Sequence, residues 1–260
     1  MSPPPKRRPP VKQKGTVPNR SAVKQKGTVP GRSGNVLYGR NPVSEALRAG
    51  RRRVHEVVVT KGVAKDFPRA RVVAADVAAE LAGTDAHQGV VAKVDAYPYA
   101  DAHELLALDA PLIVALDEVQ DPQNLGAIAR TAECAGAAGL VIPERRSAEV
   151  TPAAAKASAG AVEHLPIARV RNLADFLADA KEAGLWCYGA DGSAKTAYTQ
   201  ADWQGGLVLV LGGEGKGIRP RVRAHCDLLV SLPLHGRIGS LNVSAAAAIL
   251  LYEAASRRRG

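Results

Sequence analysis

Cysteine is scarce in this sequence, and the three that occur, Cys134, Cys187 and Cys226, stand far apart. A disulfide framework needs an even and more closely spaced set, and a zinc site usually shows Cys-x-x-Cys pairs. Neither pattern is present, so we expect no disulfide bonds and no metal site. The three thiols are predicted to be small side chains that fill the core.

Long hydrophobic runs are also missing. No stretch approaches the roughly 20 apolar residues that a membrane helix needs, and the proline-rich, basic start lacks the apolar centre of a signal peptide. The sequence therefore predicts a cytoplasmic protein with no membrane partner. With 260 residues, 46% of them hydrophobic, the chain is long enough for one large core or two small ones.

Acidic residues are absent from residues 1–34, which hold nine of the 35 Lys and Arg residues. Because all 25 acidic residues lie beyond this segment, it carries nearly all of the net charge of +10. The segment also repeats itself, since Val11–Pro18 recurs as Val23–Pro30. Its composition predicts a disordered tail. Two interpretations stay open: an arm that binds RNA phosphates electrostatically, and a solubilising extension.

Alternating helix and strand signals begin at residue 35. Val54–Thr60 and Val90–Val94 read as strands, with a short helix expected at Asp76–Leu81 between them. They predict a small α/β domain over residues 35–95. A linker over 96–110 would join it to a second α/β domain over 111–260 with a mainly parallel sheet.

A run of three arginines, Arg51, Arg52 and Arg53, follows a helix that is predicted to begin at Asn41 and Pro42 and to end at Gly50. Charge runs of this kind are usually solvated. On an RNA-binding domain they can also face phosphates. The sequence favours neither interpretation over the other.

A buried parallel strand is predicted at Leu207–Leu211, where an apolar run stops at a glycine-rich loop around Glu214. Glycines allow the backbone to approach a ligand closely, and ligands bind beyond the carboxyl ends of strands in open α/β sheets. The loop fits neither the Walker spacing nor the Rossmann spacing. It is therefore a candidate small-molecule site of another kind.

Another buried strand is predicted at Leu112–Leu116, and the helix after it has its core face at Leu125, Ile128 and Ala129. At about 100° per residue, Arg130 lies roughly 140° away from Leu125. It therefore points off the core face. Two interpretations stay open: contact with a substrate or phosphate oxygen at the edge of the sheet, and a solvated helix arginine.

Three segments carry a family resemblance: Asp121–Ala132 (Asp-Pro-Gln-Asn-Leu-Gly-Ala-Ile-Ala-Arg-Thr-Ala), Val210–Ile218 and Ile238–Ala246. In this order and spacing they resemble the three signature motifs of the SpoU (TrmH-like) RNA ribose 2′-O-methyltransferases. Val36–Leu47 and His87–Ala92 resemble that family's ribosomal-protein-like RNA-binding domain, which implies that residues 35–95 bind the RNA substrate. The arrangement is most similar to bacterial members that methylate a guanosine ribose in 23S rRNA.

The resemblance implies a catalytic domain whose C-terminal part is threaded into a trefoil knot. It implies S-adenosylmethionine as the cofactor, held largely by backbone groups near Gly212, Leu232, Leu234 and Leu241. It also implies a homodimer and an RNA partner, with rRNA favoured. The alternatives are a tRNA, another rRNA nucleotide (including one whose methylation confers antibiotic resistance), and a non-catalytic role in RNA binding or ribosome assembly.

By the same resemblance the catalytic cluster consists of Asn124, Arg130, Glu214, Ser240 and Asn242. Methyl transfer is an in-line displacement that must align the ribose 2′-oxygen and remove its proton, and no metal is required. We expect Arg130 nearest the reacting hydroxyl, and Glu214 orienting Arg130 or Asn242. Ser240 and Asn242 have a second interpretation as caps of the helix that follows them.

Overall fold

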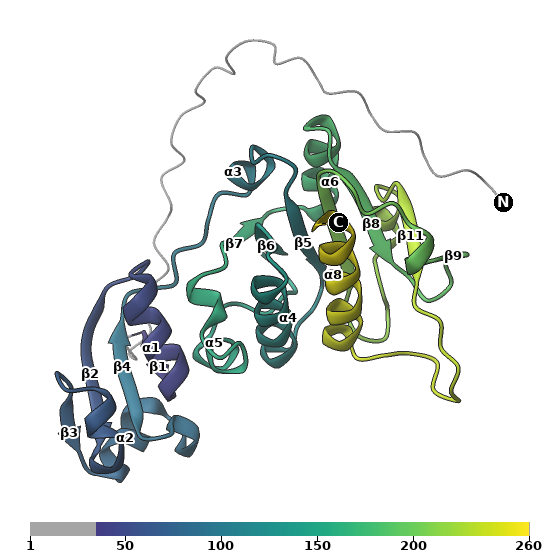
Figure 1. The fold of residues 1–260 in the computed structure, drawn as a ribbon. Coiled ribbons are helices and arrows are strands. Elements are labelled where there is room, and N and C mark those ends of the chain that lie inside the picture. Colours follow the sequence, from purple (N-terminus) through teal and green to yellow (C-terminus); the bar gives the residue numbers. More distant parts are fainter. Residues whose placement is uncertain (1–34, 260) are drawn as a thin grey trace.

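The computed structural model describes residues 35–259, so the predicted basic tail lies outside the described residues. Two sheets organise the described part (Figure 1). The N-terminal elements are β1 (Val36–Tyr38), α1 (Arg40–Ala49), β2 (Val54–Thr60), η1 (Lys61–Asp66), β3 (Arg71–Val73), α2 (Ala75–Ala82), η2 (Asp85–His87), β4 (Val90–Val94) and α3 (Ala102–Leu106). The following elements are β5 (Leu112–Asp117), α4 (Pro122–Cys134), β6 (Gly139–Pro143), α5 (Pro152–Ala157), η3 (Ala161–Glu163), β7 (Ile167–Val170), α6 (Leu173–Glu182), β8 (Trp186–Ala190), β9 (Thr196–Ala197), η4 (Tyr198–Gln200), β10 (Leu207–Gly212), α7 (Pro220–Arg223), β11 (Leu228–Ser231) and α8 (Val243–Arg259).

The smaller sheet has the order β1-β4-β2-β3, and we call the part built on it the N-terminal unit. β4 pairs antiparallel with β1 and with β2, whereas β3 pairs parallel with β2. The predicted strands β2 and β4 and the helix α2 are confirmed. The short strands β1 and β3 were not predicted, because three residues are too few for a hydrophobic period to stand out.

The larger sheet has the order β7-β6-β5-β10-β8-β11-β9, and its strand pairs are all parallel in the described part of the chain. We call the part built on it the C-terminal unit. The mixed α/β fold with a mainly parallel sheet is therefore confirmed. The domain boundaries at residues 95 and 111 and the trefoil knot stay predictions.

Both faces of the larger sheet are covered by helices (Figure 1). In β5, Val114 and Leu116 face the core that α4 and α8 close, whereas Ile113 and Ala115 face the core beneath α6. Strands covered on both faces need apolar residues at every position, not at every second one. This explains why β5 and β10 appear in the sequence as unbroken apolar runs.

The strands β5 and β10 end side by side, because Gly212 pairs in register with Asp117. The glycine loop after β10 therefore starts next to residues 118–121, which lead into α4. From β5 the chain continues to β6 on one side, while β10 and β8 lie on the other. Such a point in an open parallel sheet is where ligands bind.

The cysteine prediction is confirmed for Cys187, which is buried, and wrong for Cys134, which is exposed near the end of α4. Cys226 is half-buried. Cys134 ends an amphipathic helix, where a shift of one position turns a side chain from core to solvent. Among residues 35–259, no helix is long and apolar enough to cross a membrane.

Candidate functional site

The glycine loop is shaped by backbone contacts that exclude side chains. A Cβ on Gly212 would lie 2.1 Å from the carbonyl carbon of Gly217, and one on Gly213 would lie 2.3 Å from the main-chain oxygen of Glu118. Gly217 closes the loop by donating its N–H to the oxygen of Gly213 at 3.1 Å. The glycines thus let the loop fold back on itself and touch the end of β5.

A cavity of about 500 Å³ adjoins this loop. All four residues predicted at the cofactor, Gly212, Leu232, Leu234 and Leu241, are among its lining residues. Three of the predicted catalytic residues also line it: Glu214, Ser240 and Asn242. The structure therefore brings together segments around residues 212, 232 and 240 that the sequence keeps apart.

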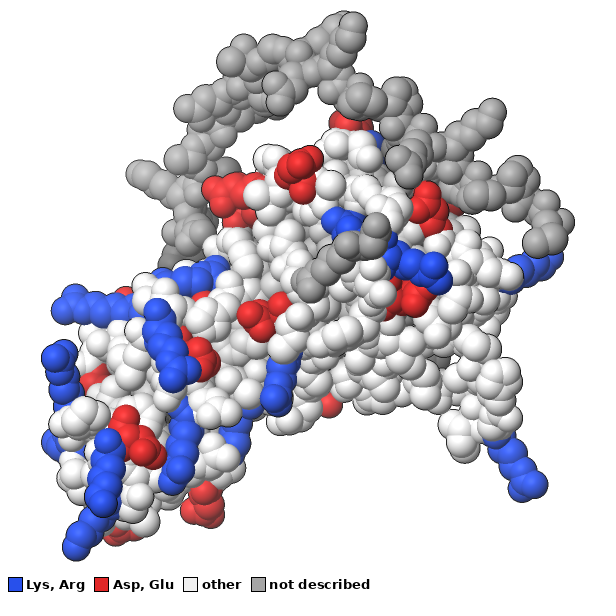
Figure 2. All heavy atoms as spheres, in the orientation of Figure 1, with Lys and Arg blue, Asp and Glu red and all other residues white. Residues whose placement is uncertain are grey.

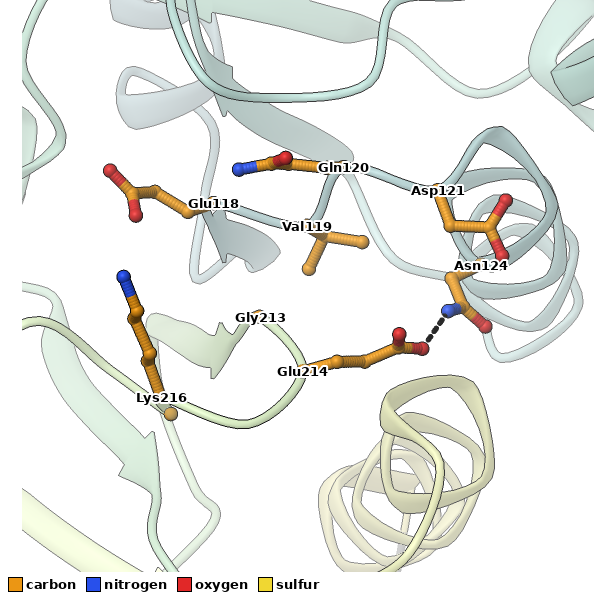
Figure 3. A pocket seen from close by; sticks show the side chains of 9 residues that line it. Glu118, Val119, Gln120, Asp121, Asn124, Gly213, Glu214 and Lys216 are labelled. Carbon is orange, nitrogen blue, oxygen red and sulfur yellow. Dashed lines mark hydrogen bonds between the residues drawn. The ribbon is translucent and has the colours of Figure 1, made fainter.

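A hydrogen-bonded network joins three of the predicted catalytic side chains. Asn124 donates its Nδ2 to Glu214 Oε1, a contact that Figure 3 marks with a dashed line. Asn242 donates its Nδ2 to Asn124 Oδ1 at 3.1 Å. Asn124 is only 6% exposed, so this amide is held between a carboxylate acceptor and an amide donor.

Asn242 both caps helix α8 and takes part in the hydrogen-bonded network. Its Oδ1 accepts the main-chain N–H of Ser244 at 2.8 Å and the Ser244 hydroxyl at 2.6 Å, which caps the start of α8. Its Nδ2 remains free for Asn124. The helix cap thereby orients the amide toward the site. Ser240 lies exposed in the extended segment before α8 and lines the larger cavity without capping the helix.

Arg130 does not join this network. It is exposed on α4, as its position off the core face predicts, and it is not among the residues that line the cavities beside the glycine loop. Glu214 accepts a hydrogen bond from Asn124, and the expectation that it orients Arg130 or Asn242 stays a prediction. Asn124 and Arg130 both lie on α4, but they are more than one helical turn apart, which separates their side chains along the helix.

A smaller cavity of about 230 Å³ adjoins the network and the glycine loop (Figure 3). It shares Gly213, Glu214 and Gly217 with the larger cavity. Its remaining lining residues are Glu118, Val119, Gln120, Asp121, Asn124 and Lys216. The sequence analysis missed the polar residues at 118, 120 and 216. In the sequence, only their position next to or within the motif segments could have indicated these residues.

Asp117 and Arg219 form a hydrogen-bonded ion pair at the end of β5, next to the smaller cavity. Asp117 is completely buried, and it accepts the main-chain N–H of Arg219 at 2.7 Å and its Nε at 2.8 Å. The hydrogen bond to Asp117 raises the pKa of Arg219 above its ordinary value. Glu118 adopts a left-handed φ of 59° and lies 3.3 Å from a guanidinium nitrogen of Arg219. The ion pairs of Arg219 with Asp117 and Glu118 therefore hold the turn between β5 and α4 in a strained conformation.

Basic side chains gather on the N-terminal unit (Figure 2). The exposed members of this set are Arg40, Arg48, Arg53, Lys61, Lys65, Arg69, Arg71 and Lys93. Arg51 and Arg52 do not belong to it, because both donate hydrogen bonds to the C-terminal unit. Both interpretations of the arginine run, solvation and contact with phosphates, are therefore wrong for Arg51 and Arg52.

Metal ligands are not clustered in the described residues, where no group of three or more His, Cys, Asp or Glu side chains could hold an ion. The polar groups beside the glycine loop are instead amides, carboxylates and backbone groups around an open space. Such an arrangement suits an organic ligand with hydrogen-bonding and apolar parts.

Two known families match the sequence. Residues 111–252 match the SpoU rRNA Methylase family, and residues 36–100 match the family described as RNA 2′-O ribose methyltransferase substrate binding. The putative TrmH family tRNA/rRNA methyltransferase YacO of Bacillus subtilis is 47% identical over 180 residues, which cover 67% of this chain and 72% of YacO. The 23S rRNA (guanosine-2′-O-)-methyltransferase RlmB of Pseudomonas putida is 39% identical over 241 residues, which cover 86% of this chain and 96% of RlmB.

Solved structures with the same fold include one with a bound cofactor. The SpoU methyltransferase AviRb from Streptomyces viridochromogenes, in complex with AdoMet, is 28% identical with a TM-score of 0.73, covering 86% of this chain and 90% of AviRb. The AdoMet-bound rRNA methyltransferase from Sinorhizobium meliloti is also 28% identical, with a TM-score of 0.72, covering 85% of this chain and 87% of that chain. Both likenesses span the two units.

Proposed function

Because the chain belongs to the SpoU rRNA Methylase family, it is an RNA 2′-O-methyltransferase that uses S-adenosylmethionine, and we propose that its substrate is a guanosine ribose of 23S rRNA. The observation that carries this proposal is the Asn124–Glu214–Asn242 network, which lies where two cavities meet. The substrate is inferred from relatives such as RlmB, which are similar over 86% of the chain.

The larger cavity is the proposed cofactor site. Its apolar walls at Leu211, Val230 and Leu232 suit the purine, and the glycine loop offers backbone groups without side-chain obstruction. When bound, S-adenosylmethionine supplies an electrophilic methyl group. Gly212, Leu232, Leu234 and Leu241 are the residues proposed to hold it.

The smaller cavity is the proposed site of the target nucleotide. It shares Glu214 with the cofactor cavity and is lined by the Asn124 amide. A 2′-hydroxyl placed there meets groups whose orientation is already fixed, which lowers the cost of aligning it for in-line transfer. Lys216 at the rim offers a positive charge to the neighbouring phosphate.

Arg130 stays the group proposed to stabilise negative charge developing on the 2′-oxygen. Guanidinium keeps its proton in proteins, so Arg130 is assigned no role as a base. Since Arg130 lies outside both cavities, bound RNA or a second copy of the chain has to complete its surroundings. Ser240 is proposed to help position the groups around the reacting ribose.

A homodimer is part of the same proposal. Large apolar side chains stand exposed on and before α8, with Ile238 76%, Leu241 44% and Tyr252 56% exposed. Exposed apolar groups in one region are typical of a protein interface. A second copy packed there would border the proposed cofactor site, which Leu241 also lines. Cytoplasmic residence is proposed from the rRNA substrate.

Methyl transfer tests the proposed function. With labelled S-adenosylmethionine and unmodified 23S rRNA or tRNA in parallel, the parent chain is expected to label a guanosine ribose of 23S rRNA. Glu214→Ala frees the Asn124 amide and Arg130→Ala removes the positive charge, so each is expected to lower the rate about 100-fold. Both residues are exposed, so the melting temperatures of the two variants should stay close to that of the parent chain.

The control is Glu182→Ala, which removes an exposed carboxylate from α6, far from the site. It should label rRNA at the parent rate. Label on tRNA alone would support the methyl-transfer chemistry but contradict the proposed rRNA substrate. Absence of label on any RNA despite normal cofactor binding would contradict the proposal.

A further inference from the structure

Helix α1 of the N-terminal unit packs against the turn that joins α5 to β7 in the C-terminal unit. Gly160 in this turn has a φ of 91°. A Cβ there would lie 2.7 Å from Cβ of Glu45 and 3.1 Å from the main-chain oxygen of Asn41, both in α1. Only glycine therefore allows the two units to approach this closely.

A buried ion pair ties the same two surfaces together. Arg52, which follows α1, donates its Nε to Glu163 Oε2 at 3.0 Å and its Nη2 to the other carboxylate oxygen. The two side chains are only 6% and 1% exposed. A two-pronged pair of this kind is geometrically specific, and removing one partner would leave a buried charge uncompensated. The pair therefore fixes the orientation of the units.

The segment that connects the two units also contacts the turn between α5 and β7, through Tyr97. The Tyr97 hydroxyl donates to the main-chain oxygen of Val162 at 2.8 Å. Burial raises the pKa of Tyr97, so the hydroxyl keeps its proton and remains a donor. Arg51 lies with its guanidinium carbon 5.9 Å from the centre of the Tyr97 ring and donates to the main-chain oxygen of Leu165 at 3.1 Å.

The turn that receives α1 is itself packed on the helix that carries Asn124. A Cβ on Gly126 in α4 would lie 2.5 Å from the main-chain oxygen of Ala154 and 2.6 Å from Cβ of Ala157, both in α5. Helices in such close backbone contact move together. A continuous packed path thus runs from α1 through the turn and α5 to α4 and Asn124.

We propose that this contact between the units positions the bound RNA, so that one ribose reaches the site beside Asn124. We name it the docking clamp, and it consists of Arg51, Arg52, Tyr97, Gly160 and Glu163. The inference rests on the proposed function, since the N-terminal unit must hold RNA for its placement to matter. Units within one chain otherwise tend to move relative to each other, and a misplacement of about 1 Å can cost about 100-fold in rate.

Two substitutions open the clamp, each with a matched control. Gly160→Ala adds a methyl group against α1, whereas Gly184→Ala adds one at a similar φ of 88° with no atom within 4 Å. Glu163→Gln removes the charge from the buried pair, whereas Glu182→Gln makes the same change on exposed α6. Tyr97→Phe removes only the hydroxyl and serves if Glu163→Gln does not fold.

The placement of the units is measured without RNA by pulsed electron paramagnetic resonance. One nitroxide is attached to the exposed Cys134 of α4 and the other to Lys65→Cys on η1. We expect a narrow distance distribution in the parent and the controls, and a broad one in the clamp variants. Melting temperature and calorimetric binding of S-adenosylmethionine verify that each variant is folded.

Methylation of 23S rRNA then tests the positioning role. In the clamp variants we expect unchanged cofactor affinity, RNA affinity and KM within about two-fold of the parent, and a kcat about 100-fold lower, with label spread over neighbouring riboses. A narrow distance distribution in the clamp variants would show that the docking clamp does not fix the placement of the units, and it would leave the proposed function untouched. Parent kcat and parent label position despite a broad distribution would overturn its positioning role. A parent chain that methylates no RNA would instead contradict the proposed function.

Discussion

At the scale of single residues, the site depends on side chains that make two hydrogen bonds at the same time. Asn242 accepts from Ser244 through its oxygen and donates to Asn124 through its nitrogen. The sequence analysis treated capping and catalysis as alternatives for this residue, yet the amide carries out one function with each end. Helix α8 thus fixes the orientation of a group in the proposed reaction site.

Substitution of Asn242 separates the two functions. Asn242→Asp keeps an oxygen that caps α8 but replaces the donor to Asn124 with a carboxylate, so stability should be nearly unchanged while methylation falls about 100-fold. Asn242→Ala loses both and should also cost about 1 kcal/mol of unfolding free energy. Thermal melting and methyl transfer measure the two effects. Full activity of Asn242→Asp would reduce this residue to a helix cap.

Cysteine reactivity gives a second prediction at this scale. Burial raises the pKa of Cys226 to about 12, so only about one thiol in 10⁴ is ionised at pH 8 and the reactive thiolate appears only as the pH rises toward 12. Cys134 is exposed. A maleimide at pH 8 should therefore modify one thiol per folded chain, and Cys134→Ser should abolish this modification. Rapid labelling of Cys226, identified by mass spectrometry, would contradict its burial.

At the scale of elements, two neighbouring strands and the loops at their ends create the site. β5 and β10 end in register at Asp117 and Gly212, so the turn into α4 and the glycine loop begin next to each other. The sequence predicted both strands and the loop. Their adjacency follows from the strand order, in which β10 comes from the far end of the chain to lie beside β5.

Gly212→Ala should disrupt this element. Its methyl group would lie 2.1 Å from the carbonyl carbon of Gly217, and a backbone neighbour cannot move aside as a flexible side chain can. We expect loss of cofactor binding by calorimetry and a lower melting temperature. Gly62→Ala, with no atom within 4 Å of the added Cβ, is the control and should bind normally. Normal binding by Gly212→Ala would show that the loop adapts.

At the scale of the whole molecule, the charge is unevenly distributed. The N-terminal unit carries an exposed basic surface (Figure 2), and residues 1–34 add nine Lys and Arg residues without an acid. Basic groups give affinity for phosphates without sequence preference. Selection of one ribose must therefore come from how the units are placed and from the site itself.

Deletion of residues 1–34 should weaken RNA binding and flatten its dependence on salt, because fewer counterions are released on binding. Cofactor affinity should stay the same, since the residues proposed to hold it begin at Gly212. The salt dependence of RNA affinity, measured for the full and shortened chains, checks this. An unchanged slope would identify the tail as a solubilising extension.

The sequence by itself determined the α/β class, the buried strands β5 and β10, and the family. These features follow from local periodicity and from motifs of fixed spacing, both of which are written along the chain. It also placed Arg130 correctly off the core face of α4.

Only the tertiary structure decided which side chains meet. Glu214 pairs with Asn124, which lies 90 positions away, and Arg52 pairs with Glu163, 111 positions away. No local pattern encodes such partners, because they depend on strand order and on the packing of one unit against the other. For the same reason Arg51 and Arg52, for which the sequence predicted contact with solvent or RNA, instead form hydrogen bonds to the C-terminal unit, whereas Arg53 stays exposed.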